Sequence, residues 1–380
     1  MKGAIMKKKV FLIISIMLIF AYQIGYAAPV PDISAESAMV IEQNTGRVLY
    51  SKNADIRRPM ASTTKIMTAI VALENGQMDD QVTVSKKAAN IEGSSIWLEE
   101  NERLSLEELL YGLMLSSGND AAYAIGEHIG GGDIEYFIEM MNKKARELSA
   151  HNTNFTNPHG LDNENHYTTA HDLAKIAAYG MKNEDFRKIV STKKKSISWS
   201  AHEWNRSLNN KNKMLWNYEG ANGIKTGYTG KSGKCLVSSA NRKGMQLVSV
   251  VLKSNDIWAD STNILDYAFD LYSPYCVVKE GEYLRSIPVL NGTKERIALY
   301  SKDEIIIPIS KIEQDQINVE IDIPESLEAP IMNEQLVGDI LISIGDELIA
   351  SSKIVVKDKI DKRSPQSIFK NIWKNWMGNL

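Results

Sequence analysis

Cysteine is scarce in this sequence, which has two among 380 residues and no C-x-x-C pair. Two cysteines cannot form a disulfide framework, and without a C-x-x-C pair the sequence has no cysteine zinc site or redox motif. An excess of positive charge is also absent, because the formal net charge is −3. A nucleic-acid-binding protein needs a strongly basic face to neutralise phosphates. These absences argue against cysteine chemistry and against nucleic acid as a partner.

The overall composition is that of a folded protein. Hydrophobic residues make up 43% of the chain and charged residues 24%, close to the averages for soluble globular domains. This balance argues against a disordered, collagen-like or coiled-coil chain. At roughly 100–200 residues per domain, the length predicts two domains, or one large domain with a smaller one.

The N-terminus has the pattern of an export signal. Four lysines precede an uncharged apolar run from Val10 to Ala21, and Gly25-Tyr26-Ala27 supplies the small residues that signal peptidase requires. An anchor helix is the alternative, but this run falls short of the roughly 20 apolar residues that cross a bilayer. We therefore expect a signal peptide in residues 1–27, cleavage after Ala27 and an exported protein.

Residues 28–274 combine helix and strand signals. Short apolar runs at 38–41 and 245–251 predict strands. Ser105 and Glu108 form a capping box in front of an apolar periodic stretch, which predicts the start of a helix. We expect a mixed α+β domain with a helical part and an antiparallel sheet.

Apolar and polar residues alternate strictly in residues 275–360. Apolar residues occupy every second position in the clearest example, and turn signals separate such stretches: Ile317, Val319, Ile321, Ile323, with turns at Asn291-Gly292 and Gly345-Asp346. This pattern is typical of half-buried strands joined by hairpins. It predicts a small all-β sandwich domain.

Residues 361–380 have the periodicity of an amphipathic helix. At ~100° per residue, one half of the helix is apolar and contains two tryptophans, whereas lysines and asparagines occupy the other half: Ile368, Phe369, Ile372, Trp373, Trp376, Met377 and Leu380 against Lys370, Asn371, Lys374 and Asn375. We expect this helix to lie on an anionic membrane surface. Docking of the helix back on the protein is the alternative.

A candidate nucleophile lies in Ser62-Thr63-Thr64-Lys65, at the predicted start of a helix, where positions three apart share one face. A lysine whose pKa is lowered by burial and neighbouring cations can deprotonate such a serine. The helix N-terminus can also donate N–H groups to an oxyanion. The pattern alone is weak, because Ser191-Thr192-Lys193-Lys194 matches it too. We interpret that second match as a solvated basic loop.

A second candidate, Ser117-Gly118-Asn119, falls where a glycine interrupts the apolar helix that begins near Ser105. A hydroxyl and an amide can face a cleft at such a break. The Ser-x-Asn pattern is common, however, and an ordinary turn explains each of its other occurrences: 207–209, 239–241 and 261–263.

The third candidate, Lys225-Thr226-Gly227, occurs once. It lies in a glycine-rich stretch followed by a strand-like run, which predicts an edge strand. A cation and a hydroxyl on such a strand can bind a substrate carboxylate. The glycine lets a substrate backbone approach closely.

The order and spacing of these three patterns resemble the active-site triplet of penicillin-binding proteins and serine β-lactamases. The surrounding segments are similar to those of the low-molecular-mass D-alanyl-D-alanine carboxypeptidases over about residues 31–272: Gly93-Ser94-Ser95, Ser117 to Ala122, Asn157 to Asp162 and Gly223 to Gly227. The resemblance implies a penicillin-binding-protein catalytic fold, followed by a β-rich domain and an amphipathic helix. It implies no cofactor and no metal.

The resemblance also implies roles in an acyl-enzyme reaction on a peptidoglycan stem pentapeptide ending in D-Ala-D-Ala. Ser62 would attack the carbonyl between the two D-alanines, Lys65 would take its proton, and Ser117 would pass a proton to the leaving amine. Asn119 would hydrogen-bond the peptide backbone. Because penicillin mimics D-Ala-D-Ala, β-lactams should acylate Ser62.

The third pattern, Lys225-Thr226-Gly227, would recognise the substrate. Lys225 and Thr226 would hold the terminal carboxylate, and Gly227 would allow the close approach. The backbone N–H groups of Ser62 and Tyr228 would form the oxyanion hole. The expected location is the outer face of the cytoplasmic membrane or the cell wall.

Three other functions remain open from the sequence. A zinc peptidase could use the histidines at 151, 159, 166 and 171, but no His-Glu-x-x-His helix is present, and His159 is interpreted as structural. A serine β-lactamase would need a Glu-x-x-x-Asn loop, which is not evident between Asn119 and Lys225. A non-catalytic wall-binding protein would not need the intact triplet. Both cysteines are interpreted as buried, and five tryptophans as core or cleft wall: Trp97, Trp199, Trp204, Trp216 and Trp258.

Overall fold

The computed structural model describes residues 29–200, 202–364 and Trp373. The signal peptide predicted for residues 1–27 therefore lies outside the described residues, as does nearly all of the helix predicted within 361–380. Among the residues that are described, no helix is long and apolar enough to cross a membrane.

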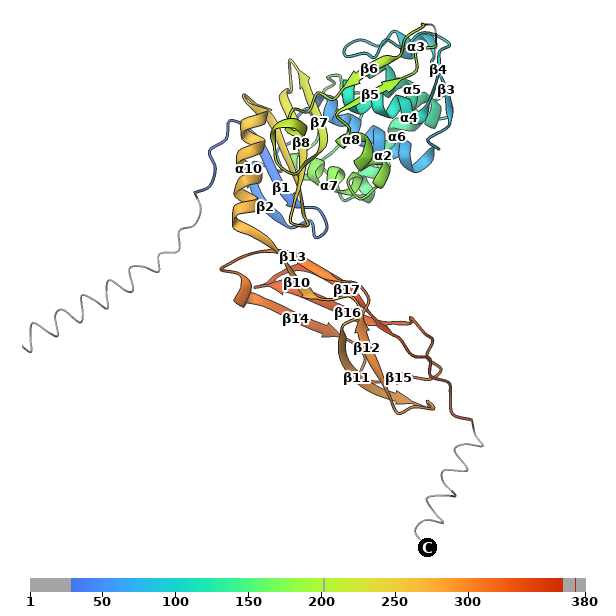
Figure 1. The fold of residues 1–380 in the computed structure, drawn as a ribbon, viewed down its shortest axis with the longest axis vertical. Helices are drawn as coiled ribbons and strands as arrows, with labels where there is room; N and C mark the ends of the chain where they lie inside the picture. Colours follow the sequence, from blue (N-terminus) through green and yellow to red (C-terminus); the bar gives the residue numbers. More distant parts are fainter. Residues whose placement is uncertain (1–28, 201, 365–372, 374–380) are drawn as a thin grey trace, which may run out of the picture. The chain divides into compact units, whose positions relative to one another are not determined.

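A five-stranded antiparallel sheet with the strand order β2-β1-β9-β8-β7 is the centre of the N-terminal domain (Figure 1). Its strands are β1 Ser37–Glu42, β2 Val48–Lys52, β7 Ala221–Thr229, β8 Gly233–Arg242 and β9 Met245–Ser254. The apolar runs at 38–41 and 245–251 thus form strands, as predicted. The strand β7 ends the order, which confirms the edge strand predicted around Lys225.

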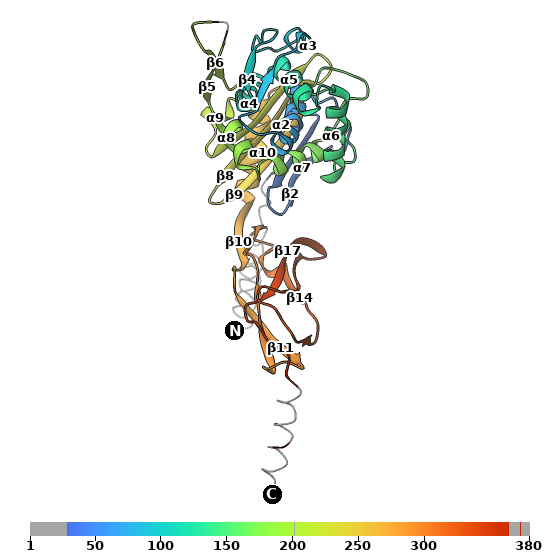
Figure 2. The same cartoon turned by 90° about the vertical axis from the view of Figure 1, so that its right-hand side faces the viewer.

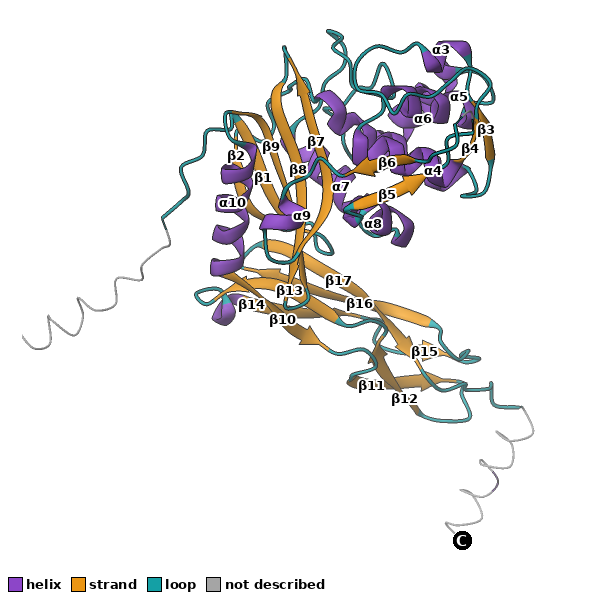
Figure 3. Cartoon of the chain, turned by 45° about the horizontal axis from the view of Figure 1, so that its top comes forward, coloured by secondary structure: helices purple, strands orange, loops and turns teal. Residues whose placement is uncertain are grey.

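Both faces of this sheet are covered, because every residue of β1 is buried. Met39 and Ile41 belong to the core shared with the helical part, whereas Ala38 and Val40 belong to a second core with α10, Ile257–Leu271. This division follows from the alternation of side chains along a strand. Figure 3 shows α10 against one face of the sheet and α7 and α8 on the other side.

The helical part packs against the face opposite α10. Its elements are η1 Ala61–Thr64, α2 Lys65–Asn75, α3 Lys86–Ala89, α4 Leu106–Tyr111, the π-helical turn η2 Gly112–Ser116, α5 Asn119–Ile129, α6 Ile134–Glu147, α7 Ala170–Gly180 and α8 Glu184–Ser191. The short helix α9 Met214–Asn217 instead contributes Met214 to the core that contains α10. Helix α4 begins with the predicted capping box, since Ser105 accepts from the Glu108 N–H and the Glu108 carboxylate accepts from the Ser105 N–H.

Two short hairpins accompany these helices: β3 Gln81–Thr83 with β4 Arg103–Ser105, and β5 Lys194–Ile197 with β6 Arg206–Asn209. Figure 2 shows β5 and β6 running out side by side to a loop at their tip. That second hairpin contributes to a polar network beside the candidate site, described below.

The C-terminal domain is all-β, as predicted. Its strands are β10 Tyr272–Val278, β11 Tyr283–Leu290, β12 Arg296–Ser301, β13 Ile305–Ser310, β14 Ile317–Asp322, β15 Leu327–Glu328, β16 Leu336–Ile344 and β17 Glu347–Val356. They form a six-stranded sheet and a two-stranded sheet around a separate apolar core. The turns predicted at Asn291-Gly292 and Gly345-Asp346 join β11 to β12 and β16 to β17.

Two interpretations of burial are partly wrong. Cys235 is buried, but Cys276 on β10 is exposed. The indole of Trp97 is 72% exposed, and those of Trp204 and Trp216 are also exposed, so these three are not core residues. An apolar side chain is not buried for that reason alone, and it stays exposed where no second layer of the structure covers it.

Candidate active site

Ser62 lies in the 3-10 turn η1, which leads directly into α2 with Lys65 as its first residue. The turn begins at Ala61, a buried residue with a positive φ of 49°. This geometry confirms the helix predicted near Ser62. It also places Ser62 at the N-terminal end of the α2 segment, where backbone N–H groups lack helical partners.

The Lys65 amine lies at the centre of the site, although its side chain is fully buried. Its Nζ is 3.0 Å from Ser62 Oγ, 2.7 Å from Asn119 Oδ1 and 2.7 Å from the backbone oxygen of His159. Asn119 Oδ1 and the backbone oxygen of His159 can only accept hydrogen bonds. A neutral amine therefore donates its two N–H groups to these oxygens, and its lone pair can accept the proton of the Ser62 hydroxyl.

The electrostatics favour that neutral amine. Burial lowers the pKa of Lys65 well below its usual value, and the positive charges of Lys225 and Lys211 lower it further. The carboxylate of Asp120 acts in the opposite direction, but it is the smallest of the four influences. Lys65 is thus suited to act as a general base toward Ser62.

The π-helical turn η2 positions Ser117 and Asn119. Ser117 ends that turn in the left-handed conformation, with φ 65°, and its side chain lines the cavity. The Asn119 side chain is buried, with Nδ2 donating to the backbone oxygen of Glu92. That contact directs Oδ1 toward Lys65 and leaves the second Nδ2 hydrogen for a ligand. Backbone strain of this kind gathers at functional sites.

The segment Asn157 to Asp162 forms the support behind Lys65. Gly160, with φ +90°, packs so closely on η1 that a Cβ there would lie 1.9 Å from the backbone oxygen of Ala61. The same segment supplies the His159 carbonyl to Lys65. This placement agrees with the structural interpretation of His159.

The histidines near this segment are held neutral. Burial is the main cause that lowers the pKa of His159 to about 3 and that of His166 to about 4. His166 Nδ1 accepts from the Thr156 N–H, so its Nε2–H donates to Thr64 Oγ1. Within the described parts of the chain, no group of three or more His, Cys, Asp or Glu side chains is arranged to hold a metal ion.

The edge strand β7 brings its Lys-Thr-Gly segment against η1. A Cβ on Gly227 would be 3.1 Å from the backbone nitrogen of Ser62, so the close packing needs glycine. Lys225 is 1% exposed, and its Nζ donates to the backbone oxygen of Thr226. Burial, followed by the charge of Lys211, lowers the pKa of Lys225 to about 7.

These elements enclose a cavity of about 310 Å³ lined by Ser62, Ser94, Ser117, Lys211, Thr226, Gly227, Tyr228, Lys234, Ile257 and Trp258. Five of the eight predicted site residues line this cavity. The other three, Lys65, Asn119 and Lys225, lie behind it and hydrogen-bond to lining residues. Ser191, from the second match to the Ser-x-x-Lys pattern, ends α8 and is not among the lining residues.

Several lining residues were missed from the sequence. Lys211 lies in the loop after β6 and Lys234 on β8, whereas Trp258, in the first turn of α10, lines the cavity as its interpretation as core or cleft wall allows. The two lysines are ordinary surface-type residues outside any repeated pattern, and only the fold brings them to the cavity. Ser94 lies in the segment Gly93-Ser94-Ser95, for which the sequence predicted no role. Its backbone oxygen accepts from the Asn119 N–H at 2.6 Å.

A serine paired with a buried lysine, between a helical part and the edge strand of an antiparallel sheet, defines the class of active-site-serine penicillin-interacting enzymes. Residues 24–256 match the model of the D-alanyl-D-alanine carboxypeptidase family, and residues 272–362 match the penicillin-binding protein 5 C-terminal domain. The chain therefore belongs to the D-alanyl-D-alanine carboxypeptidase family of low-molecular-mass penicillin-binding proteins.

Individual relatives agree with this assignment. D-alanyl-D-alanine carboxypeptidase DacF of Bacillus subtilis is 35% identical, with 96% of this chain and 97% of the relative covered. The crystal structure of penicillin binding protein 5 from Haemophilus influenzae has a TM-score of 0.73 and 30% identity, covering 87% of this chain and 99% of its own. The Streptomyces K15 DD-transpeptidase structure has a TM-score of 0.60 and 38% identity, covering 63% of this chain and 99% of its own.

Proposed function

We propose that this protein is a serine D-Ala-D-Ala carboxypeptidase that removes the terminal D-alanine from peptidoglycan stem pentapeptides. The observation that carries the proposal is the position of the Lys65 amine, whose Nζ lies 2.7 Å from each of two fixed acceptors and 3.0 Å from Ser62 Oγ. Such an amine activates a serine without a histidine or a metal ion. The family assignment supports the same reaction.

Acylation begins when Ser62 Oγ attacks the carbonyl carbon between the two D-alanines while its proton passes to Lys65 Nζ. The backbone N–H groups of Ser62 and Tyr228 stabilise the negative charge on the carbonyl oxygen. Ser117 then relays the proton to the departing nitrogen, the C–N bond breaks, and D-alanine leaves. The result is an ester between Ser62 and the shortened peptide, with a neutral Lys65.

Deacylation repeats the sequence with water. Lys65 accepts a proton from a water molecule that attacks the ester, and Ser62 leaves as its hydroxyl after proton return. Hydrolysis frees the tetrapeptide. A β-lactam enters the same first step, but its ring-opened acyl group stays attached, so it blocks the water from reaching the ester.

Substrate selection depends on the cations of the cavity. Lys225 and Thr226 hold the terminal carboxylate, and Lys211, which lines the same cavity, adds a second positive charge. Charge-assisted hydrogen bonds of this kind are stronger than neutral ones. The free second hydrogen of Asn119 Nδ2 donates to the peptide carbonyl on the other side of the scissile bond.

One experiment separates this function from its alternatives. The purified protein is incubated with labelled penicillin and, separately, with a pentapeptide ending in D-Ala-D-Ala, and both are followed by mass spectrometry. We expect one penicillin per chain on Ser62 and release of free D-alanine. Rapid penicillin hydrolysis without D-alanine release would instead indicate a β-lactamase, and neither adduct nor release would indicate a non-catalytic wall-binding protein.

A transfer reaction is the second candidate, because a DD-transpeptidase is among the similar structures. Adding glycine as an acceptor amine tests it within the same assay. We expect tetrapeptide as the main product. A product heavier by one glycine residue, formed in preference to tetrapeptide, would assign this site to transfer.

The C-terminal segment places the enzyme on the outer face of the cytoplasmic membrane in this proposal. Its support is the sequence of residues 361–380, which has an apolar helical half and lysines opposite. Deleting residues 365–380 should abolish sedimentation with vesicles of anionic lipid, while turnover of small peptides persists. Equal sedimentation of the full-length and shortened proteins would contradict this location.

A further inference from the structure

The active-site cavity has more cationic side chains than a single terminal carboxylate requires. Lys211 and Lys234 line the cavity, and Lys225 lies behind it with its Nζ bonded to the backbone oxygen of Thr226. The described residues that line the cavity include no aspartate or glutamate, and within the described ranges none of these three lysines forms an ion pair. A substrate with a second anionic group would therefore meet a cation that has no partner.

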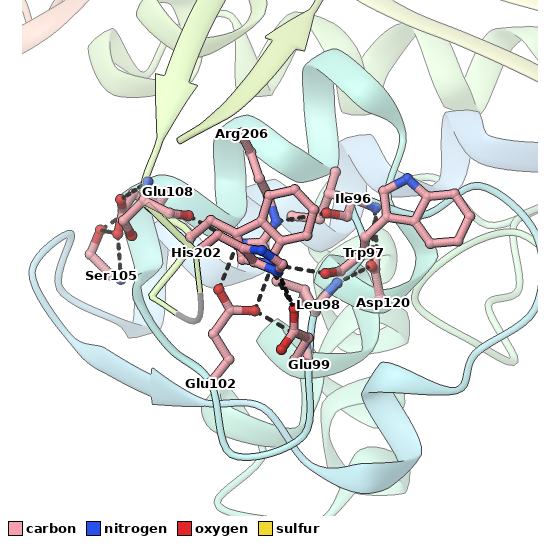
Figure 4. A network of polar contacts seen from close by, with 12 residues as sticks. Ile96, Trp97, Leu98, Glu99, Glu102, Ser105, Glu108, Asp120, His202 and Arg206 are labelled. Carbon is pink, nitrogen blue, oxygen red and sulfur yellow. Dashed lines mark hydrogen bonds and ion pairs between the residues drawn. The ribbon is translucent and has the colours of Figure 1, made fainter. Parts of the chain in front are cut away.

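Buried carboxylates that contact the loop of residues 94–102 are bound to other groups. Figure 4 shows Glu102 against the Arg206 guanidinium and Asp120 against the backbone of residues 96–98. Asp120 accepts from the N–H groups of residues 96 and 98 at 3.0 and 3.1 Å. Both carboxylates thus have partners of their own, and neither pairs with a lysine of the cavity.

Lys234 has a defined place beside the edge strand. It is paired with Tyr228 across the β7–β8 ladder, and paired residues on neighbouring strands point their side chains to the same face. Its Nζ donates to the backbone oxygen of Asn255 at 2.9 Å, which uses one of the three ammonium hydrogens. Tyr228 and Trp258 line the same cavity. A lysine fixed through one hydrogen thus lines the cavity together with two aromatic side chains.

An acidic side chain, Asp162, contacts the end of β7 from the other face. Its Oδ1 accepts from Thr229 Oγ1 at 2.8 Å. Side chains alternate along a strand, so Thr229 points away from the face of Tyr228 and Lys234. Asp162 therefore does not neutralise the charge of Lys234.

The position of Lys234 along β7 indicates which part of a substrate it faces. In the proposed function, Lys225 and Thr226 hold the terminal carboxylate, and the Tyr228 N–H contacts the oxygen of the scissile carbonyl. The stem peptide then runs along the edge strand from Thr226 to Tyr228 and continues beyond it with the residues that precede the scissile bond. Lys234 is level with Tyr228, two strand residues or about 7 Å from the level of Thr226. It therefore faces the preceding stem residues and not the terminal carboxylate.

The third residue of a peptidoglycan stem is a diamino acid that directly precedes the two D-alanines. Its side chain ends in an amine alone when it is lysine, and in an amine and a carboxylate when it is diaminopimelate. We propose that Lys234 binds this second carboxylate, so that the enzyme prefers stems with diaminopimelate over stems with lysine. Tyr228 and Trp258 pack against the methylene groups of the same side chain. The inference rests on the proposed function, because it needs the stem peptide to lie along β7.

The test uses three pentapeptides that differ only in the third residue: diaminopimelate, its neutral carboxamide, and lysine. For the wild-type enzyme we expect kcat/KM to be about fivefold higher with diaminopimelate than with the other two, equivalent to about 1 kcal/mol for a partly exposed ion pair. Added salt should reduce this preference, because it screens the pair. Lys234→Gln should abolish the preference, and Lys234→Glu should favour the lysine stem. Lys231→Gln is the matched control, since Lys231 is an exposed lysine of the same hairpin that does not line the cavity.

The two proposals fail in distinguishable ways. If the wild-type enzyme releases D-alanine from none of the three peptides, the proposed function itself is wrong. If it cleaves all three with equal kcat/KM, or if Lys234→Gln keeps the preference, only the contact to diaminopimelate is wrong. An equal fall for all three peptides in Lys234→Gln would also overturn that contact, because it would show that Lys234 acts on a group that the three peptides share.

Discussion

Arg206 and Glu102 form a buried bidentate ion pair, with Nη–Oε distances of 2.6 and 2.7 Å, although they lie 104 positions apart in the chain. Glu102 also accepts from the Glu99 N–H, and the ring of Trp199 stacks on the Arg206 guanidinium at 4.3 Å. The pair thereby ties the tip of the β5–β6 hairpin to the loop that lines the cavity.

This pair gives the first prediction. Arg206→Met should destabilise the N-terminal domain by roughly 3–5 kcal/mol, because it leaves the Glu102 carboxylate buried without a partner. The double variant Arg206→Met with Glu102→Leu should lose less than the sum of the two single changes. Urea unfolding followed by tryptophan fluorescence measures both. Additive losses would show that the two charges do not depend on each other.

An exposed ion pair serves as the control for that experiment. Lys294 and Asp358 are 2.9 Å apart, but both side chains are more than half exposed. Exposed pairs contribute at most about 1 kcal/mol, because water screens them. Lys294→Ala should therefore change the free energy of unfolding far less than Arg206→Met does.

The second prediction concerns the nucleophile. Ser62→Ala should lower D-alanine release at least roughly 1,000-fold and abolish the covalent penicillin adduct, since Ser62 Oγ is the hydroxyl that hydrogen-bonds to the Lys65 amine. Ser191→Ala, in the other Ser-x-x-Lys sequence, should change neither. Peptide mapping of the adduct by mass spectrometry checks the assignment. A penicillin label on any residue other than Ser62 would refute it.

The third prediction distinguishes a lysine base from a metal. Lys65→Arg places a permanently charged guanidinium where the mechanism needs a neutral amine, and arginine cannot accept the Ser62 proton near neutral pH, so acylation should slow by about 10²–10⁴-fold. A chelator should leave the wild-type rate unchanged. Stopped-flow measurement of penicillin acylation checks the first expectation. Loss of activity with the chelator and its recovery with zinc would support the metallopeptidase alternative instead.

The fourth prediction concerns pH. Lys65 must be neutral to accept a proton, so kcat/KM should rise with pH as the lowered pKa of Lys65 is passed. Lys225 must be protonated to attract the carboxylate, and its pKa is about 7. For a free-acid substrate, kcat/KM should therefore fall as the pH rises through about 7, because this ratio reports ionisations of the free enzyme.

An amidated substrate is the control for the fall in kcat/KM at alkaline pH. Without a terminal carboxylate it should lose roughly 2–5 kcal/mol of transition-state binding. Its kcat/KM should also lack the fall near pH 7, because Lys225 no longer has an anion to attract. The same fall in kcat/KM at alkaline pH with both substrates would show that Lys225 acts on Ser62 rather than on the carboxylate.

The sequence alone predicted the features that depend on neighbours along the chain. The capping box at Ser105 and Glu108, the strands at 38–41 and 245–251, and the alternating strands of the C-terminal domain all follow from local periodicity. The candidate residues Ser62, Lys65, Ser117 and Lys225 were identified because their order and spacing resemble those of a known family. Local periodicity was sufficient for the secondary structure, whereas the site residues also needed the order and spacing of three motifs along the chain.

Only the tertiary structure determined how these residues act together. The partners of Lys65 lie 54 and 94 positions away, at Asn119 and in the His159 backbone, and no local pattern encodes such contacts. The fold likewise buries both Lys65 and Lys225, which lowers both pKa values, and it brings Lys211 to the cavity. It exposes Cys276 and Trp97, because burial depends on which layer covers a residue and not on the type of side chain.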